Sequence, residues 1–263
     1  MTTADFTTVT ETWGLPASPE QLAMQYFRYR MAADLSANRD VLEIGCGSGM
    51  GLPYLGARAH MVVGGDYTTG LLREARAQLP ATDLVRMDAQ HLPFGDRSLD
   101  VVLMLEMIYY VADQDAAFAE CRRVLRPGGS LMVCVPNPDR PDFNPSPFST
   151  HYPSAAGLAS LLERHGFEAS VFGAFPVEAA SSRDRVLAPI RHFAVRYHLI
   201  PSSMHAKALV KRVLYGRLPA LGAVHEGMGT YSAPSELDVA RGPHRGFKNL
   251  YAVGTVSSKV APG

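Results

Sequence analysis

The chain has 263 residues, of which 47% are hydrophobic and 19% charged, and its 25 basic residues balance its 25 acidic ones. This composition excludes a wholly disordered chain, and the balanced charge argues against a dedicated nucleic-acid binder. No apolar run reaches the ~18 residues that span a bilayer. The N-terminus has neither a basic nor an apolar leader segment, and the three cysteines lack CxxC spacing. We therefore expect no secretory signal and a location in the reducing cytoplasm.

Short apolar runs alternate with helical stretches along most of the chain. A helix is predicted over residues 19–37, and further helices at residues 71–79 and 114–125. Seven strands are predicted, at residues 41–44, 60–66, 83–88, 99–105, 131–135, 169–175 and 250–256. Runs that are apolar on both faces and separated by helices are typical of a parallel sheet covered on both sides.

Residues 176–247 interrupt this alternation. Apolar residues keep helical spacing at residues 186–200 and 209–214, so this segment is predicted to form a helical lid between the last two strands. Residues 181–217 contain eight basic residues and one acid, a net charge of +7, so the rest of the chain carries −7. This basic segment could be a solvated face, an electropositive mouth for an anionic acceptor, a membrane-contacting surface or an oligomer interface.

A glycine cluster, Gly45-Cys46-Gly47-Ser48-Gly49, follows the first predicted strand. Glycines allow a sharp turn and close approach of a ligand, and a following helix would present free N–H groups to it. The dinucleotide pattern G-x-G-x-x-G fails in both registers, because Met50 and Leu52 stand at its third glycine, and the P-loop lysine is missing. The spacing therefore favours a smaller zwitterionic head over a pyrophosphate.

Two acids end the next predicted strands. Asp66, at the end of the second strand, could accept both hydroxyls of a ribose, and Asp88, at the end of the third, could accept from an adenine amino group. Asp66 could instead cap a helix, and Asp88 could be a turn residue. The tyrosines of the first helix, Tyr26 and Tyr29, could be ordinary packing residues.

Together these motifs resemble those of class I S-adenosylmethionine (SAM)-dependent methyltransferases. The resemblance rests on EIGCGSG at residues 43–49, on Asp66, on MDAQHLPF at residues 87–94 and on RVLRPGG at residues 123–129. It covers roughly residues 25–175. It implies a Rossmann-like α/β fold whose seven-stranded, mostly parallel sheet has the order 3-2-1-4-5-7-6, with the seventh strand antiparallel. It also implies SAM as the cofactor, without a metal.

The resemblance implies cofactor-binding roles at matching positions. Three glycines would pass under the methionyl part, Tyr67 would lie against the adenine, and the first helix would cover the cofactor carboxylate. The complete set of expected cofactor residues is Tyr26, Arg30, Glu43, Gly45, Gly47, Gly49, Asp66, Tyr67, Asp88, Ala89, Glu106 and Tyr110.

General-base candidates are residues expected beyond the carboxyl ends of the strands. Histidine titrates near neutral pH and suits that role. His151 lies in a Pro- and Asn-rich loop over residues 137–153, and His225 precedes Glu226. Tyr109, after the fourth strand, is the third catalytic candidate.

The overall prediction is an enzyme that methylates an oxygen of a small molecule such as a secondary metabolite or sugar. Nitrogen methylation and a lipid or quinone acceptor stay open, as do a homodimer, a protein of this fold that binds SAM without methyl transfer, and a nucleic-acid methyltransferase using the basic segment. The predicted organisation is an N-terminal helical cap (residues 1–37), a SAM-binding domain (residues 38–175 with 248–263) and the lid (residues 176–247).

Overall fold

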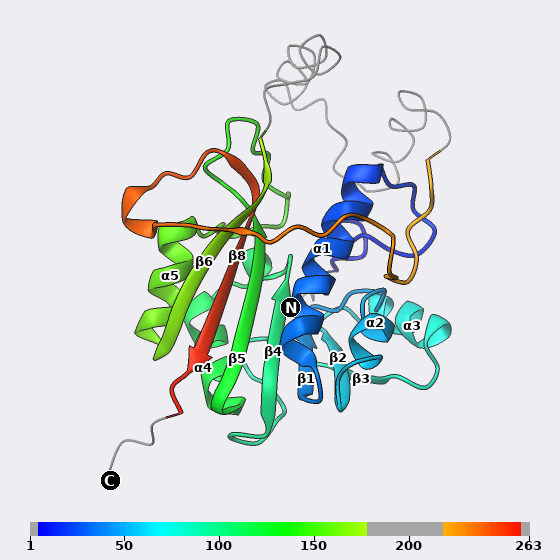
Figure 1. Ribbon diagram of the computed structural model, residues 1–263. Coiled ribbons are helices and arrows are strands. Elements are labelled where there is room, and N and C mark those ends of the chain that lie inside the picture. Colours follow the sequence, from blue (N-terminus) through cyan, green and yellow to red (C-terminus); the bar gives the residue numbers. More distant parts are fainter. Residues whose placement is uncertain (1–4, 178–217, 259–263) are drawn as a thin grey trace.

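The computed structural model describes residues 5–177 and 218–258, and one mixed α/β sheet forms its centre (Figure 1). The eight strands have the order β3-β2-β1-β4-β5-β8-β6-β7. Their bounds are β1 Asp40–Ile44, β2 Met61–Asp66, β3 Asp83–Arg86, β4 Leu99–Leu105, β5 Leu125–Pro136, β6 Phe167–Pro176, β7 Ser235–Glu236 and β8 Phe247–Val256. Strands β1 to β5 pair in parallel, whereas β8 runs antiparallel to both β5 and β6.

Five α-helices connect or flank these strands. They are α1 Pro19–Ser36, α2 Leu52–Gly56, α3 Thr69–Gln78, α4 Gln114–Val124 and α5 Ala155–Arg164, and two short 3₁₀ turns are η1 Ile108–Tyr110 and η2 Val239–Arg241. Ser18 begins α1 with a capping box, since its side chain accepts from the amide of Gln21, whose side chain accepts from the amide of Ser18. Asp113 and Ser154 cap α4 and α5 in the same general way, each by accepting a backbone N–H.

The sheet order confirms the predicted topology, with β8 in the place of the expected seventh strand. The expected count of seven strands needs one correction, because the two-residue β7 pairs with the outer edge of β6. Both β7 residues are polar and exposed, so no apolar alternation marks this strand in the sequence.

The predicted lid lies mainly outside the described residues. Its two expected helices and the whole basic segment of residues 181–217 fall within residues 178–217, outside the described part. The described part, residues 218–247, contains β7 and η2 but no α-helix. Figure 1 shows this segment in orange, crossing α1 before it enters β8.

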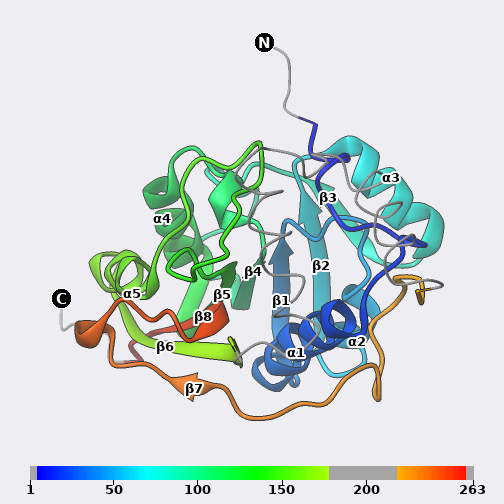
Figure 2. The same cartoon turned by 90° about the horizontal axis from the view of Figure 1, so that it is seen from above.

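Alternate side chains of the central strands point to opposite faces of the sheet and pack into two separate hydrophobic cores. In Figure 2, α1 and α2 lie on one side of the sheet and α4 and α5 on the other. Val41, Val101 and Leu103 pack with Phe27 of α1. The alternate residues Leu42, Val102 and Met104 pack on the other face with Phe118 of α4. Burial on both faces explains why these strands are continuous apolar runs.

The parallel strands end together at one edge of the sheet. Ile44, the last residue of β1, is in register with Gly65 of β2 and Met104 of β4. The turn after β1, the acid that ends β2 and the residues after β4 are therefore neighbours at this carboxyl edge. Within the described ranges, no helix is both long and apolar enough to cross a membrane.

Arg123 of α4 fastens the segment that follows β3. Its guanidinium donates to both carboxylate oxygens of Glu120 at 2.7 Å, to the carbonyls of Leu92 and Phe94 at 3.0 and 2.8 Å, and to Asp96 at 2.8 Å. A guanidinium has five N–H donors in a fixed fork, which suits this multiple pairing. The segment it holds leads directly from the acid after β3 to β4.

Arg123→Gln should therefore lower the free energy of unfolding by about 2 kcal/mol, because it removes a bidentate ion pair and bonds to two carbonyls. Arg122→Gln, at the neighbouring helix position, should change it by less than about 0.5 kcal/mol. Urea unfolding followed by circular dichroism measures both values. Equal effects of the two substitutions would contradict the assignment.

Candidate active site

Two neighbouring cavities open at the carboxyl edge of the parallel strands. The first holds about 210 Å³ and the second about 360 Å³. They share Gly45, Met107 and Tyr110. Because both cavities reach the turn after β1, one extended ligand could occupy the two together.

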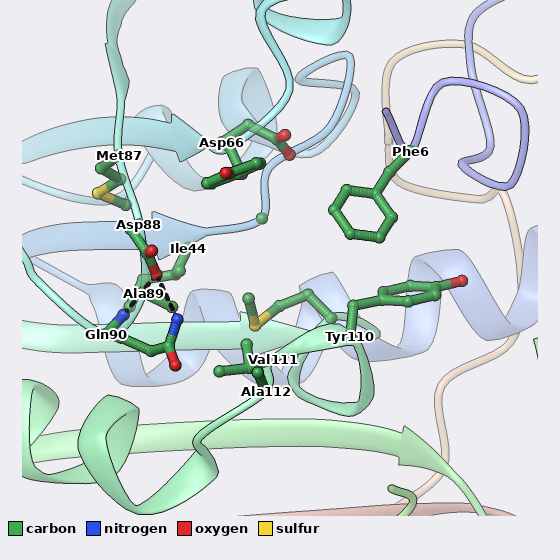
Figure 3. A pocket seen from close by; sticks show the side chains of 13 residues that line it. Phe6, Ile44, Asp66, Met87, Asp88, Ala89, Gln90, Tyr110, Val111 and Ala112 are labelled. Atoms are coloured by element: carbon green, nitrogen blue, oxygen red, sulfur yellow. Dashed lines mark hydrogen bonds between the residues drawn. The ribbon is translucent and has the colours of Figure 1, made fainter. Parts of the chain in front are cut away.

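The first cavity is a slot with mostly apolar walls (Figure 3). Asp66 comes from the end of β2, and residues 87–90 follow β3. Phe6 reaches the cavity from the N-terminal segment, and its ring centroid lies 5.1 Å from that of Tyr110. Flat apolar walls with carboxylates beside them suit a nucleoside, which presents an aromatic base and polar hydroxyls.

Asp66 is bound to the glycine turn. Its Oδ2 accepts from the amide of Gly47 at 2.9 Å, and its Oδ1 accepts from the amide of Thr68 at 2.7 Å. Burial raises the pKa of this carboxyl, while the two backbone bonds oppose the shift. Since each carboxylate oxygen has two lone pairs, both oxygens keep capacity for hydroxyl donors in the cavity.

The expected glycines adopt a backbone that other residues rarely take. Gly45, Gly47 and Gly49 have φ values of +73°, +58° and +80°. A Cβ at Gly45 would also lie 2.7 Å from the side chain of Met107. The helix after this turn is α2, which begins only at Leu52 and has five residues.

The far end of the first cavity contains Asp88 and Ala89, as expected. Asp88 Oδ1 accepts from the amide and side chain of Gln90 at 2.9 and 3.0 Å, shown as dashed lines in Figure 3. Its Oδ2 receives no hydrogen bond from the described residues and is open to an amino group. Tyr67 lines the same cavity, is 36% exposed and lies under the guanidinium of Arg86 at 5.7 Å.

The N-terminal segment, residues 5–17, covers both cavities. Phe6 lines the first cavity, and Val9, Thr10 and Glu11 line the second. The indole N–H of Trp13 donates to the carbonyl of Ser48 in the glycine turn at 2.7 Å. The predicted cap of residues 1–37 includes this segment, but the sequence indicates no site residue in it, because it has no helical or alternating period to reveal a packed face.

The same segment is joined to residues 219–221 by backbone hydrogen bonds. The amide of Gly14 donates to the carbonyl of Leu221 at 2.9 Å, and the amide of Leu221 donates to the carbonyl of Leu15 at 2.8 Å. The amide of Ala17 donates to the carbonyl of Pro219 at 2.9 Å. We call this backbone pairing of residues 14–17 with residues 219–221 the rim.

Glu106 lies at the centre of a polar cluster in the second cavity. Its Oε1 accepts from the side-chain amide of Asn249 at 2.9 Å, and its Oε2 accepts from the hydroxyl of Tyr109 at 3.1 Å. Arg28 lies 3.8 Å from Glu106 and 3.4 Å from Glu11. Burial raises the pKa of Glu106, opposed by Arg28 and Tyr109.

Glu106 also has an unusual backbone, with φ of +60°. A non-glycine residue in this left-handed region is uncommon and persists only where the surroundings impose it. Here the amide of Glu106 donates to the carbonyl of Cys134 at 2.9 Å, directly after β4 ends. This conformation is consistent with a side chain held for function.

The face of α1 that meets the second cavity differs from the expected one. Arg28 and Tyr29 line the cavity together with Gln25. Tyr26 and Arg30 do not line either cavity. Residues four apart share one helix face, so these two point together toward residues 226–231.

The contacts of Tyr26 and Arg30 account for that orientation. The Tyr26 hydroxyl donates to Glu226 at 2.5 Å, and the guanidinium of Arg30 lies 5.4 Å from the ring of Tyr231 and pairs with Asp34. Helical spacing around Gln21, Gln25 and Arg28 marks the cavity face, but the sequence does not show which face meets the sheet edge.

The two expected catalytic histidines also lie outside both cavities. His151 is exposed, and its carbonyl accepts from Gln114 at 2.8 Å. His225 is exposed and its Nδ1 contacts the carbonyl of Glu226 at 2.9 Å. Of the three catalytic candidates, Tyr109 lines the second cavity. No cluster of His, Cys, Asp and Glu suited to a metal occurs in residues 5–177 and 218–258.

Tyr110, an expected cofactor residue, lines both cavities, and its hydroxyl donates to Ser146 at 2.8 Å. Glu43 lies deeper, behind the glycine turn. Its side chain is buried, and its Oε1 accepts from the hydroxyl of Tyr29 at 2.6 Å. Its Oε2 has no partner among the described residues. Burial raises the pKa of Glu43 to about 7, against the opposing effects of Tyr29 and Arg28.

This shift predicts a pH-dependent stability. The ordinary value is 4.5, so the folded state binds a proton more tightly than the unfolded state up to pH about 7. The free energy of unfolding should therefore fall as pH rises through this window. Glu43→Gln removes the titration, so its stability relative to wild type should rise by about 3 kcal/mol across the window.

Urea unfolding of both proteins at several pH values measures the change. Glu168→Gln, the same substitution at an exposed glutamate on β6, is the matched control. A stability difference between Glu43→Gln and wild type that stays constant with pH would contradict the role of Glu43.

The sequence is similar to those of known methyltransferases. Residues 42–133 match the family model described as a methyltransferase domain. A probable S-adenosylmethionine-dependent methyltransferase of Mycolicibacterium smegmatis is 40% identical over 146 residues, covering 53% of this chain and 56% of the relative. A probable phthiotriol/phenolphthiotriol dimycocerosates methyltransferase 2 of Mycobacterium ulcerans is 33% identical over 170 residues, covering 61% and 62%. The chain thus spans little more than half the length of these relatives.

Among solved structures, a SAM-dependent methyltransferase from Archaeoglobus fulgidus superposes with a TM-score of 0.57 at 15% identity, covering 91% of this chain and 95% of the other. At that identity the likeness shows the fold alone, and it agrees with the sheet described above. The sequence matches show a methyltransferase domain over residues 42–133 and make the chain similar to proteins named as S-adenosylmethionine-dependent methyltransferases, whose cofactor is SAM.

Proposed function

We propose that this chain binds SAM across the two cavities and transfers its methyl group to a hydroxyl oxygen of a small-molecule acceptor, such as a secondary metabolite or sugar. The observation that carries the proposal is the junction of the cavities at Gly45. On one side lies a nucleoside-sized slot, and on the other lies a larger cavity with a carboxylate at its centre.

The residues of the first cavity fit the nucleoside part of SAM. Asp66 has free lone pairs for the ribose hydroxyls, and Asp88 Oδ2 is open to the adenine amino group. Tyr67 and Phe6 would lie against the base. The glycine turn brings backbone, rather than side chains, to the junction where the methionyl part would pass.

The face of α1 fits the zwitterionic end of the cofactor. Arg28 is a cation that the methionyl carboxylate could pair with, and Glu11 and Glu106 are acids for its ammonium group. Burial favours the neutral form of Arg28, but Glu11 and Glu106 outweigh it and raise the pKa of the guanidinium. Arg28 therefore stays charged at any physiological pH.

Glu106 supports oxygen as the methylated atom. Bound SAM supplies an electrophilic methyl on a sulfonium, and a hydroxyl acceptor must lose its proton as the new oxygen–carbon bond forms. A carboxyl whose pKa is raised is a better proton acceptor than an ordinary one. Asn249 and Tyr109 hold Glu106 in place, and Tyr109 donates to it with its own pKa raised by burial and by the Glu106 charge.

A lipid alcohol is a second candidate acceptor. The Mycobacterium ulcerans relative is named for phthiotriol dimycocerosates. Met24, Met50 and Leu105 line the second cavity of this chain and would pack against an apolar acceptor. Nitrogen methylation receives less support, since a neutral amine needs no proton acceptor to react.

The proposal includes an organisation of the chain. The catalytic domain comprises residues 38–175 and 248–263, residues 1–37 cap it, and residues 176–247 are the lid and substrate region. A cytoplasmic location is part of the same proposal, supported by three buried and unpaired cysteines.

Asp66→Asn should weaken binding of SAM at least about tenfold, because it replaces a charged acceptor of the ribose hydroxyls by an amide that must also donate. Asp83→Asn, an exposed acid at the opposite end of the sheet, should leave the affinity unchanged. Calorimetry measures the dissociation constant, and the fluorescence of Trp13, the single tryptophan, reports contact with the glycine turn. Equal affinity of the two variants would overturn the ribose assignment.

Glu106→Gln should lower the rate of methyl transfer by about 100-fold or more, because loss of a general base has effects of this size. The wild-type rate should rise with pH as Glu106 loses its proton, and the variant should lose this acidic limb when both rates are measured at saturating SAM, since Glu106 also faces the proposed ammonium site. Transfer of labelled methyl groups from SAM to a panel of alcohols, phenols and amines measures both. Tight SAM binding without transfer to any compound of the panel would instead favour a binding protein of this fold.

A further inference from the structure

Arg140 places a second guanidinium in the larger cavity. It lies in the segment of residues 137–153, just after β5 ends at Pro136, and it lines the cavity with Pro136, Asn249 and Tyr109. Its side chain is 22% exposed. Arg140 therefore comes to the cavity from the segment after β5, whereas Arg28 comes to it from α1.

The guanidinium of Arg140 lacks hydrogen-bond acceptors within the described residues. Its Nε–H group is buried and has no hydrogen-bond acceptor. The nearest carboxylate belongs to Asp142, whose Oδ1 is 3.6 Å from that Nε and whose side chain is 46% exposed. This distance is too long for a hydrogen bond, so the acid provides only a weak and solvent-screened attraction.

The other cation of the cavity is in a different situation. Arg28 lies between Glu11 and Glu106, at 3.4 and 3.8 Å. Its charge is therefore balanced by carboxylates in the same cavity, while the charge of Arg140 is not. A buried N–H without an acceptor is unfavourable, and an oxyanion that bonds to the guanidinium fork would give the buried Nε of Arg140 its acceptor.

We propose that Arg140 binds an oxyanion of the acceptor, a carboxylate or a phosphate, while the acceptor hydroxyl faces Glu106. The inference rests on the methyl transfer proposed above and adds the substrate class, a hydroxylated acid. The planar fork of arginine recognises both anions by paired N–H···O bonds. Glu106 and Arg140 then act on two different groups of one molecule, and so fix which hydroxyl is presented for methylation.

Binding of simple oxyanions tests this site separately from catalysis. Protein saturated with S-adenosylhomocysteine is titrated in a calorimeter with benzoate, with phenyl phosphate and with benzamide, the uncharged analogue of benzoate. Wild type should bind benzoate or phenyl phosphate at least about tenfold more tightly than benzamide. The stronger of the two anions identifies the carboxylate or phosphate source.

Three variants make the assignment specific. Arg140→Gln should reduce affinity for the preferred anion at least about tenfold, and Arg140→Lys should recover only part of it, because an ammonium lacks the fork. Asp142→Asn should strengthen binding about two- to threefold by removing the nearby acid. Arg73→Gln, on the exposed side of α3, controls for the loss of one positive charge.

The outcomes separate this inference from the proposed function. If wild-type protein does not bind S-adenosylhomocysteine, both the proposed function and the Arg140 site are wrong. Normal cofactor binding with no preference for either anion over benzamide, or with equal anion binding by Arg140→Gln and Arg73→Gln, would overturn the Arg140 site alone. The latter results would favour the neutral lipid alcohol as acceptor. Anion affinity that falls in Arg140→Gln and stays in Arg73→Gln supports the proposal.

Discussion

The burial of Arg28 beside carboxylates is the interaction on which the larger cavity depends. This one guanidinium ties the N-terminal segment, through Glu11, to the end of β4, through Glu106. It also lowers the pKa of Glu43 against the effect of burial. Acids taken out of water favour their protonated forms, and Arg28 opposes that effect by lowering the pKa of Glu43 and Glu106.

The part of the site that sequence patterns placed correctly is local. Gly45, Asp66 and Asp88 each follow a strand directly, and parallel strands bring their carboxyl ends together whatever the surrounding detail. The part that sequence patterns missed depends on long-range packing. Helix α1 has no marked apolar stripe, so its phase, and with it the choice of Arg28 over Arg30, follows only from contacts with the sheet and residues 226–231.

A catalytic role of His151 or His225 stays a prediction, but the structure places neither histidine in the two cavities. A loop residue near a strand end was taken to face the acceptor, but backbone hydrogen bonds decide where a loop side chain points. His151 offers only its carbonyl to Gln114. The proton acceptor that we propose instead is Glu106, whose left-handed backbone turns its side chain toward Asn249.

The family match divides the site in an informative way. Residues 42–133 include Asp66, Asp88 and Glu106, whereas Glu11, Arg28, Arg140 and Asn249 all lie outside that range. The matched range therefore contains the residues proposed for the nucleoside and the proposed proton acceptor, and leaves out Glu11 and Arg28, proposed for the methionyl end, and the residue proposed for the acceptor anion. In the proposal, the acceptor anion is bound by Arg140, from the segment after β5.

The rim couples the N-terminal segment to residues 219–221. Residues 14–17 bond to residues 219–221, which are more than 200 positions away in the sequence. Closing so long a loop costs conformational entropy, although this cost grows only with the logarithm of the loop length. Most of the loop is already closed by the pairing of β8 with β5 and β6, so the rim adds little further entropic cost. A chain shortened to begin at Pro19 would thus keep its sheet and lose a backbone partner for residues 219–221. Residues 14–17 and 219–221 would therefore open together as one cooperative unit, and their hydrogen-bonded amides would exchange with solvent at one common rate.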